Sequence, residues 1–516
     1  MIAESKKRSA IPIKPGMLPL LTGINDFLTE HGIQSYIVGG FIRNALLDRD
    51  TADIDIAIST DAPKIASVLA AALDGRHIIL DDVNRVSRVI IKNTTREKVL
   101  WQIDLSAITE GIEQDLGRRD FTIDAMASPL GSIINKGIVD TGLIDPFSGL
   151  DDIRHRVIRA IEDDVFQSDA LRLLRGVRLA AELGFTIDPN TETLMRQHSC
   201  LINSVAGERV REELLKLLAS TESGRFIIYL DDLGLLMTMI PELAQTRGVE
   251  QPREHQWDVF NHSVKAVDAV DFVLRHGNWE YSDKGILDCV PWSADIEKHF
   301  NGKVGGGGST RRPLLKLAAL LHDIAKPQTK AIDDQGKTRF FGHAEKGAAI
   351  ATDILERLRF STRETNLVAG VVRYHLRPIQ TCQNEPPSRR AIYRYFRDTT
   401  EAAIDTLYFS LADHLATRGP NLDINNWHQH AALVEYIITQ HENHADITAP
   451  PKIISGHDIM NTFNLTQGQK IGELLEAVRE AQASAEIATR EEAILYVKKL
   501  LGSKKPGSGG NNSDGL

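Results

Sequence analysis

Cysteine is scarce in this chain, which has only three among its 516 residues: Cys200, Cys289 and Cys382. Because these residues are few, far apart and odd in number, they predict neither a disulfide framework nor a zinc site built from thiolates. The N-terminus lacks the apolar segment of a secretory signal, and no uncharged run approaches the length of a membrane span. These absences together predict a cytoplasmic protein with no membrane segment.

An excess of positive charge is also missing, because 60 lysines and arginines stand against 70 acidic residues and give a formal charge of -10. Such a chain is not expected to coat nucleic acid non-specifically, although a locally basic groove on an acidic body remains compatible with RNA binding. The length predicts several domains, and an apolar fraction of 42% is ample for buried cores.

One stretch, residues 36–59, carries the most informative pattern in the chain. An apolar run enters the pair Gly39-Gly40, and an amphipathic segment with Arg43 follows. The chain then continues as Asp-Ile-Asp-Ile-Ala-Ile over residues 53–58. This alternation is typical of a half-buried strand.

The two acids of that strand point to metal chemistry. With a side-chain period of two, Asp53 and Asp55 project from the same face. Two neighbouring carboxylates repel each other unless a cation lies between them, and Mg²⁺ takes one or two carboxylates together with substrate phosphates. The glycine pair leaves backbone N–H groups open to a phosphate, and Arg43 adds a fixed positive charge. The alternative is an exposed acidic strand after a glycine turn, but the order of the elements favours a metal-nucleotide site.

At these residues the chain resembles the nucleotidyltransferase superfamily of the DNA polymerase β type. More narrowly, it is similar to the class II tRNA nucleotidyltransferases, which are the CCA-adding enzymes and their bacterial poly(A) polymerase relatives. The family motif is Gly-Gly-x-x-Arg-Asp followed by Asp-x-Asp, and here Asn44 replaces the acid after Arg43. The resemblance implies an α+β protein in which a head with a small mixed sheet precedes helical regions, and it implies Gly40 and Arg43 as ligands of a nucleoside triphosphate.

The segments around this stretch predict the rest of the head. A helix is expected over residues 17–32 and another over 62–73. Two strand-like runs, 86–92 and 98–105, read as a hairpin across a turn at 93–95. Asp104 in the second run is a candidate third catalytic carboxylate, with a solvated strand residue as the alternative.

A second motif follows at residues 118–127, Arg-Arg-Asp-Phe-Thr-Ile-Asp-Ala-Met-Ala. It resembles the family pattern Arg-Arg-Asp-Phe-Thr-x-Asn-Ala, with Asp124 in place of the asparagine. The resemblance implies that Arg119 contacts the triphosphate and that Asp120 braces the site. The preceding segment, 106–117, is short where many CCA-adding members carry a flexible loop linked to the switch from C to A addition. This shortness favours an enzyme that adds only CC as an alternative.

A helical stripe of charge comes next, with Asp169, Arg172, Arg175 and Arg178 at steps of three. Like charges at this spacing disfavour an isolated helix, so a negatively charged partner is expected, with a solvated basic face as the alternative. The resemblance implies that Asp169 and Arg172 pair with the edge of the incoming base, and that the other two arginines hold the triphosphate. Cytosine and adenine both offer an exocyclic amine beside an unprotonated ring nitrogen, which suits this pair. Residues 207–218 are expected to support the stripe.

A second site is predicted further along the chain. An apolar helix over residues 314–325, ended by Pro327, carries His322 next to Asp323. With His262 upstream and Asp413 downstream, the pattern resembles the HD phosphohydrolase superfamily. The resemblance implies a divalent metal of unknown identity, and further candidates that suit a second metal are His343 and His375. Taken singly, each histidine is more often an ordinary core or surface residue than a metal ligand.

The resemblance covers nearly the whole chain. The chain is expected to divide into a nucleotidyltransferase head (1–150), a helical neck (151–245), an HD domain (246–420), a C-terminal helical region contacting tRNA (421–501) and a disordered tail (502–516). The glycine-rich stretch at 302–310 is expected to be a flexible loop. The resemblance implies this order of domains. The resemblance also implies addition of CCA to the 3′ end of tRNA from CTP and ATP with Mg²⁺, and a phosphohydrolase activity of the HD domain. Alternatives are CC-only addition, poly(A) synthesis, and an HD hydrolase whose head only binds RNA.

Overall fold

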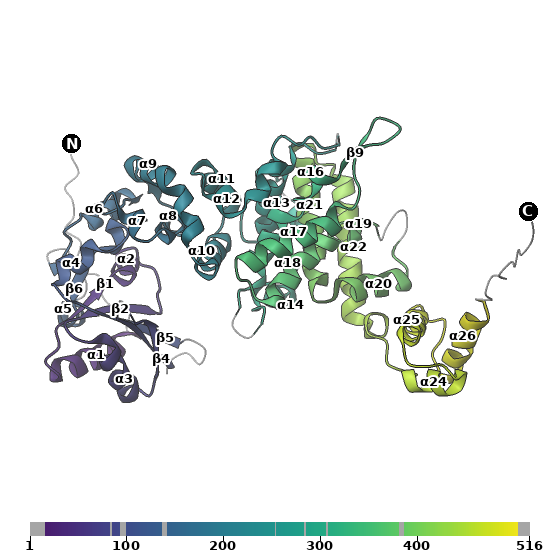
Figure 1. Cartoon of the computed structure of the whole chain (residues 1–516), viewed down its shortest axis with the longest axis horizontal. Coiled ribbons are helices and arrows are strands. Elements are labelled where there is room, and N and C mark those ends of the chain that lie inside the picture. Colours follow the sequence, from purple (N-terminus) through teal and green to yellow (C-terminus); the bar gives the residue numbers. More distant parts are fainter. Residues whose placement is uncertain are drawn as a thin grey trace, which may run out of the picture. The chain divides into compact units, whose positions relative to one another are not determined.

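The computed structural model describes residues 16–82, 85–92, 100–136, 142–252, 254–282, 285–305, 308–380 and 386–503 (Figure 1). The chain forms two compact units. Unit 1 comprises residues up to 217 together with 229–239, and unit 2 comprises 218–228 together with 240 onward. The predicted boundaries near 150 and 420 lie inside these units and stay predictions, as does the tail, most of which lies outside the described residues.

Unit 1 contains a six-stranded sheet with the strand order β3-β4-β5-β2-β1-β6. Strands β2 and β5 are parallel, and the other neighbouring pairs are antiparallel. The strands and the first three helices, in chain order, are α1 (Leu18–Glu30), β1 (Ser35–Val38), α2 (Gly40–Leu46), β2 (Asp53–Ile58), α3 (Ala62–Ala72), β3 (Arg76–Asp81), β4 (Val86–Lys92), β5 (Leu100–Ala107) and β6 (Ala127–Pro129). The small mixed sheet and the α+β class are therefore confirmed.

The alternation in β2 sets the two faces of the sheet. Ile54, Ile56 and Ile58 are fully buried, whereas Asp53 is exposed and Asp55 half-buried. Figure 1 shows α1 and α3 on one side of the sheet and α2 on the other. The strand thus anchors its apolar face in the core and presents its carboxylates on the opposite face.

The two strands of the predicted hairpin are present, but the sequence did not predict strand β3 beside them. Strands β4 and β5 pair as expected, and the turn predicted at 93–95 lies outside the described residues. Strand β3 forms the sheet edge, and three consecutive apolar residues in it, Ile78, Ile79 and Leu80, are all exposed. Because such a run shows no alternation, periodicity alone did not reveal this strand.

The rest of unit 1 is helical. The three arginines of the charged stripe lie on α8 (Leu171–Leu183), which buries Leu173, Leu174 and Val177 on its opposite side. Asp169, predicted to lie on the same helix, precedes it in an extended conformation. Helix α8 ends at Gly184, whose φ of 67° is the left-handed conformation that favours glycine at a helix end. The other helices that matter below are α4 (Ile112–Gly117), α6 (Gly149–His155), α7 (Val165–Ser168), α9 (Pro189–His198) and α10 (Gly207–Ala219).

Unit 2 is almost entirely helical (Figure 1). Helix α13 packs against α15 and α21, and α17 packs against α18. Their bounds are α13 (Val259–Val273), α15 (Arg311–Leu321), α17 (His343–Arg357), α18 (Thr362–Tyr374) and α21 (Ala403–Arg418). After α22 (Ile424–Asn443), the helices α24 (Gly456–Phe463), α25 (Gln469–Ala483) and α26 (Arg490–Ser503) share a small apolar core of their own. No helix among the described residues is long and apolar enough to cross a membrane.

The helix predicted over 314–325 ends earlier than expected. Helix α15 stops at Leu321, and His322 and Asp323 follow it directly. The His322 ring places Nδ1 2.8 Å from the carbonyl oxygen of Ala319, which competes with continuation of the backbone ladder. Pro327 does not end this helix, because it lies in the first turn of the short helix α16 (Lys326–Thr329), where proline is well tolerated.

The described part of the glycine-rich loop closes on itself. Lys303 and Thr310 form an isolated antiparallel bridge, and the N–H of Val304 donates to the carbonyl oxygen of Ser309. The segment is therefore a turn between α14 (Ala294–Asn301) and α15, and its predicted flexibility is not tested.

Candidate functional site

The carboxylates predicted on the sheet lie side by side. Strands β2 and β5 pair in parallel with Asp55 opposite Asp104 and Asp53 opposite Gln102. The Asp104 carboxylate is held by Arg88 of β4, whose Nε and Nη2 lie 2.7 Å from its two oxygens. Asp104 therefore lies where the sequence predicted, but its charge is already balanced by an arginine.

A tight glycine turn covers Asp55. Gly39 has a φ of 66°, and a Cβ atom on it would lie 2.5 Å from Nη1 of Arg119 and 3.4 Å from Oδ2 of Asp55. Any side chain at this position would therefore collide with the arginine. The turn brings residues of β1, β2 and the second motif into contact at one point, as the sequence-based site requires.

Burial changes the titration of Asp55. Desolvation raises its pKa to about 6; the charge of Arg119 opposes this, and the neighbouring acids Asp104, Asp124 and Asp53 add to it. A buried acid surrounded by other acids favours a bound cation. The site has the donor chemistry of a hard divalent ion, with one strand supplying a carboxylate pair and the remaining ligands left to substrate phosphates and water.

Arg43 lies beneath the turn and is engaged by protein groups. Its Nη1 lies 2.6 and 2.7 Å from the two carboxylate oxygens of Asp124, and its Nε and Nη2 each lie 3.2 Å from Oδ1 of Asn44. The residue is only 9% exposed. Its guanidinium is therefore mostly committed to these two side chains.

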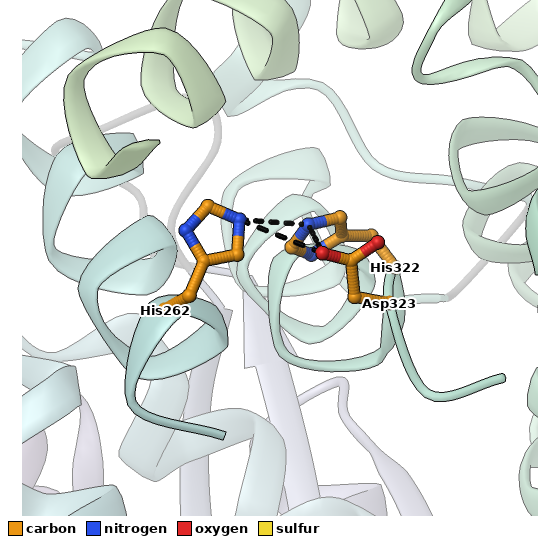
Figure 2. Close-up of side chains that lie close together, drawn as sticks. All are labelled: His262, His322 and Asp323. Carbon is orange, nitrogen blue, oxygen red and sulfur yellow. Dashed lines mark hydrogen bonds and ion pairs between the residues drawn. The ribbon is translucent and has the colours of Figure 1, made fainter. Parts of the chain in front are cut away.

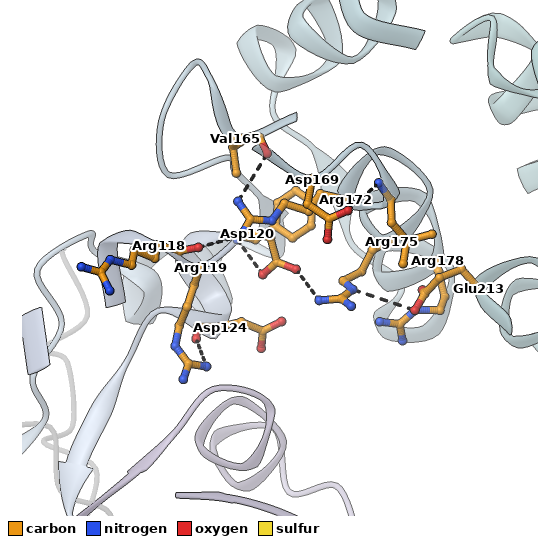
Figure 3. Close-up of polar contacts among 12 residues, drawn as sticks. Arg118, Arg119, Asp120, Asp124, Val165, Asp169, Arg172, Arg175, Arg178 and Glu213 are labelled. Carbon is orange, nitrogen blue, oxygen red and sulfur yellow. Dashed lines mark hydrogen bonds and ion pairs between the residues drawn. The ribbon is translucent and has the colours of Figure 1, made fainter. Parts of the chain in front are cut away.

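The arginine stripe on α8 is ordered by carboxylates (Figure 3). Arg175 donates to Asp120 at 3.0 Å, and burial of that acid is outweighed by the arginine, so the pKa of Asp120 lies below its ordinary value. Arg178 lies between Glu213 of α10 and Glu182 of its own helix. The like charges of the stripe are thus offset within the protein.

Asp169 and Arg172, the two residues expected to meet the base, each bond to other protein groups. Asp169 accepts from both Nη atoms of Arg209 on α10, at 3.2 and 2.8 Å, and this pairing outweighs burial and lowers the pKa of Asp169. Arg172 donates to the backbone oxygen of Arg118 at 2.6 Å (Figure 3). It also donates to Oγ of Ser168 at 3.0 Å. Each side chain is therefore oriented by its own partner.

The second predicted site gathers six side chains in unit 2. Nε2 of His262 lies 3.2 Å from Nε2 of His322 (Figure 2). The same atom lies 3.0 Å from Oδ1 of Asp413. Oδ2 of Asp323 lies 3.0 Å from Nε2 of His322, and its Oδ1 lies 3.5 and 3.9 Å from Nε2 of His343 and His375. Asp323 is thus common to two potential metal groups, His262-His322-Asp323 and Asp323-His343-His375.

The histidine tautomers favour metal binding. Nδ1 of His322, His343 and His375 faces a backbone carbonyl oxygen at 2.8, 2.6 and 2.7 Å respectively. When Nδ1 carries the proton, the lone pair of Nε2 points toward Asp323, and this is the usual arrangement around a metal. Burial lowers the pKa of His375 to about 3, which keeps that ring in its neutral, ligating form. The residues therefore fit divalent ions.

Three family models match the chain. They are described as a poly A polymerase head domain (residues 35–159), a probable RNA- and SrmB-binding site of polymerase A (184–246) and an HD domain (293–418). The A-adding tRNA nucleotidyltransferase of Deinococcus radiodurans is 32% identical over 92% of this chain and 96% of its own. The CC-adding enzyme of Thermus thermophilus is 30% identical over 92% and 96%. This chain belongs to the tRNA nucleotidyltransferase family.

The fold agrees with this membership. The structure of a Thermotoga maritima CCA-adding enzyme complexed with tRNA-CCA matches with a TM-score of 0.54 and 19% identity, over 95% of this chain and 96% of that one. The family predicted from the sequence and its HD domain are thus confirmed. The HD match contains every predicted ligand of the second site except His262.

Sequence reasoning missed several partners in this tRNA nucleotidyltransferase. Arg88, Arg209 and Glu213 each hold a predicted site residue, and Lys326 contacts Asp323 at 2.5 Å. The strand pattern offered no reason to pair Arg88 with Asp104. The charged helix at 207–218 was expected to support the stripe, but its spacing did not show which charges meet.

The raised pKa of Asp55 leads to a pH prediction. Because its folded-state pKa of about 6 lies above the ordinary 3.8, the metal-free native state holds the proton more tightly, and stability falls as pH rises through this window. A divalent cation held by Asp55 would compete with that proton, and Mg²⁺ is the ion expected from the sequence. We expect the Mg²⁺ concentration for half-maximal nucleotide incorporation to rise about tenfold for each pH unit below 6. A Mg²⁺ requirement that is constant across pH 6 would contradict this.

Proposed function

We propose that this protein adds C and A residues to the 3′ end of tRNA, using CTP and ATP and no nucleic-acid template. The observation that carries the proposal is the convergence of Asp55 and Arg119 at the Gly39-Gly40 turn, with Asp53 two residues before Asp55 on the same strand. A carboxylate pair with an arginine across a glycine turn suits a metal-bound triphosphate.

In this proposal Asp53 and Asp55 hold Mg²⁺, which when bound lowers the pKa of the attacking 3′-hydroxyl and stabilises the leaving pyrophosphate. Arg119 lies against Gly39 and binds the triphosphate there. Gly40 leaves room for the phosphates, and Arg175 contributes positive charge while Asp120 fixes its position. Arg178 supports this arrangement through Glu213, which also lies 3.9 Å from Arg175. Asp104, already paired with Arg88, adds negative charge beside Asp55.

Base selection in this proposal rests on Asp169 and Arg172. A carboxylate that accepts and a guanidinium that donates satisfy the edges of cytosine and adenine, whereas uracil and guanine leave buried groups unpaired. Arg209 keeps Asp169 ionised and in place, which preserves its role as an acceptor. The tRNA acceptor end is expected to be recognised by its shape and backbone.

Loss of Arg209 is expected to relax this selection. In Arg209→Ala, Asp169 loses a bidentate partner, so we expect the preference for CTP over UTP to fall roughly 10-fold, in line with one charge-assisted hydrogen-bonded pair. Single-turnover incorporation of each nucleotide measures this. Arg196→Ala removes an arginine from a half-exposed pair with Glu192 in the same unit and serves as the matched control. Equal loss of CTP and UTP incorporation in Arg209→Ala would contradict a role in selection.

Addition of only part of CCA is a second candidate. Only residues 108–111 connect β5 to α4, so the described structure has no long loop at this point. Four relatives that match over 94–97% of their own length are named A-adding or CC-adding enzymes. These observations favour a division of labour in which this chain performs one stage.

One experiment decides among these activities. The purified protein is offered labelled CTP or ATP with tRNAs that end before CCA, before CA or before A. Extension of all three supports complete CCA addition. Extension by C alone supports the CC-adding candidate, extension of only the last substrate supports an A-adding enzyme, and long A tails would identify a poly(A) polymerase. No extension of any tRNA would contradict nucleotide transfer.

A second activity is proposed for unit 2, where the HD residues form a site for hydrolysis of a phosphate ester. His262, His322, Asp323 and Asp413 hold one divalent ion, and His343 and His375 with Asp323 hold a second. Lys326 beside Asp323 adds a positive charge suited to a phosphate. Measuring the release of phosphate from RNA ends, or the opening of a cyclic phosphate at those ends, tests this activity.

We also expect the protein to work in the cytoplasm.

A further inference from the structure

Two departures from the family pattern contact the same side chain. The sequence has an amide at Asn44 where the family motif has an acid, and an acid at Asp124 where the second motif has an amide. These residues are 80 positions apart, yet both bind Arg43. Both carboxylate oxygens of Asp124 accept from Nη1 of Arg43, and Oδ1 of Asn44 accepts from Nε and Nη2 of Arg43.

The positive charge of Arg43 requires a negative partner because the side chain is almost completely buried. Arg43 is 9% exposed, and the side chain of Asp124 is 14% exposed. A buried guanidinium with one carboxylate is compensated, whereas a second acid, or none, leaves an uncompensated charge. One acid and one amide on Arg43 satisfy this condition in either order, and this chain has the reverse of the family order.

The same contacts reach the nucleotide turn. A Cβ on Gly40 would lie 3.3 Å from Nη2 of Arg43, so the guanidinium packs directly under the turn. The backbone oxygen of Asp124 also accepts from Nη1 of Arg119, at 3.4 Å. Residue 124 therefore contacts both arginines that flank Gly39-Gly40, one through its side chain and the other through its backbone.

We propose that Asn44 and Asp124 are a compensated exchange, and that Asp124 is a positioning residue that locks Arg43 under the glycine turn. Arg43 then acts by shaping the turn that receives the triphosphate, since its own donors are taken by protein partners. This inference rests on the proposed nucleotidyl transfer and specifies how its phosphate-binding turn is held.

The test is an exchange of the two side chains. Among the described residues, Asp124 is the one acid that forms an ion pair with Arg43, and Asp124→Asn removes it. We expect kcat/KM for CTP to fall roughly 10- to 100-fold, chiefly through a higher KM, because a small displacement of the turn weakens nucleotide binding. Asn44→Asp adds a second acid, and we expect a smaller loss. The double variant Asn44→Asp/Asp124→Asn restores one acid and one amide, and should return kcat/KM to within roughly threefold of the wild type.

Thermal unfolding gives a second readout that does not depend on activity. We expect Asp124→Asn to lower Tm by about 4 °C or more and the double variant to recover most of that loss. Asp151→Asn, an acid-to-amide change in an exposed pair with Arg154 of the same unit, is the control and should change neither quantity.

The outcomes separate cleanly. If the double variant is no better than Asp124→Asn in both kcat/KM and Tm, the two departures are independent and the inference is wrong. If Tm recovers but kcat/KM does not, Asp124 has only a structural role and the positioning role is refuted. An inactive wild-type protein would contradict the proposed function, and the Tm cycle would still decide whether residues 44 and 124 compensate each other.

Discussion

Replacing Asp55 with alanine is expected to reduce nucleotide incorporation into tRNA by roughly a thousandfold while leaving any phosphohydrolase activity of unit 2 intact. Asp55 is half-buried, unlike the exposed Asp53, and it lies against the glycine turn beside Arg119. Removing it takes away the proposed metal ligand and one of the acids that face Arg119, and electrostatic groups of this kind contribute factors of about 10² to 10³ or more. Single-turnover extension of a tRNA that lacks CCA measures the loss.

The stability of this variant separates loss of function from loss of fold. Since burial raises the pKa of Asp55 to about 6 from 3.8, its ionised form costs about 3 kcal/mol in the metal-free protein at neutral pH. Asp55→Ala should therefore be no less stable than the wild type without Mg²⁺. Asp151→Ala, in an exposed position, is the matched control and should keep full activity. Substantial incorporation by folded Asp55→Ala would refute the metal-nucleotide site on β2.

Replacing Asp323 with asparagine is expected to remove both metal ions from unit 2 at once. Asp323 is fully buried and belongs to both potential metal groups, with one oxygen toward His322 and the other toward His343 and His375. An uncharged amide that keeps the volume of the side chain cannot balance two divalent ions. Titration with Mn²⁺, in an Asp55→Ala background so that the sheet site contributes little, measures the number of ions bound.

A matched variant makes this result specific. His343→Ala disrupts only the group that contains His343 and His375, so it should keep the ion held by His262, His322, Asp323 and Asp413. The wild-type unit should thus bind two ions, His343→Ala one and Asp323→Asn none. Hydrolysis of RNA-end phosphates should follow the metal content, while tRNA extension by Asp323→Asn should be unchanged. Retention of one ion in Asp323→Asn would show that the carboxylate is not shared.

The two sites differ in how much the sequence predicted. In unit 2, the His-Asp pair and the four distant candidate ligands were all named, and the structure brings these side chains together. On the sheet, Asp55 and Arg119 also lie together at the glycine turn and their roles stay predictions, but the interpretation of Arg43 as a phosphate ligand did not anticipate its bond to Asp124. Similarly, Asp104 was placed beside Asp55 without its partner Arg88.

Local patterns in the sequence determined the elements: the alternation of Asp53 to Ile58, the glycine turn before α2 and the three-residue steps of the stripe on α8. Each is set by neighbours within a few residues, so a single stretch of chain is enough to read it. Only the tertiary structure decided which opposite charge each arginine takes. Asp169 pairs with Arg209, 40 residues away, and Arg43 pairs with Asp124, 81 residues away. The packing of strands and helices, and not their periodicity, brings these distant side chains together, and the nearly buried Arg43 in particular requires an opposite charge.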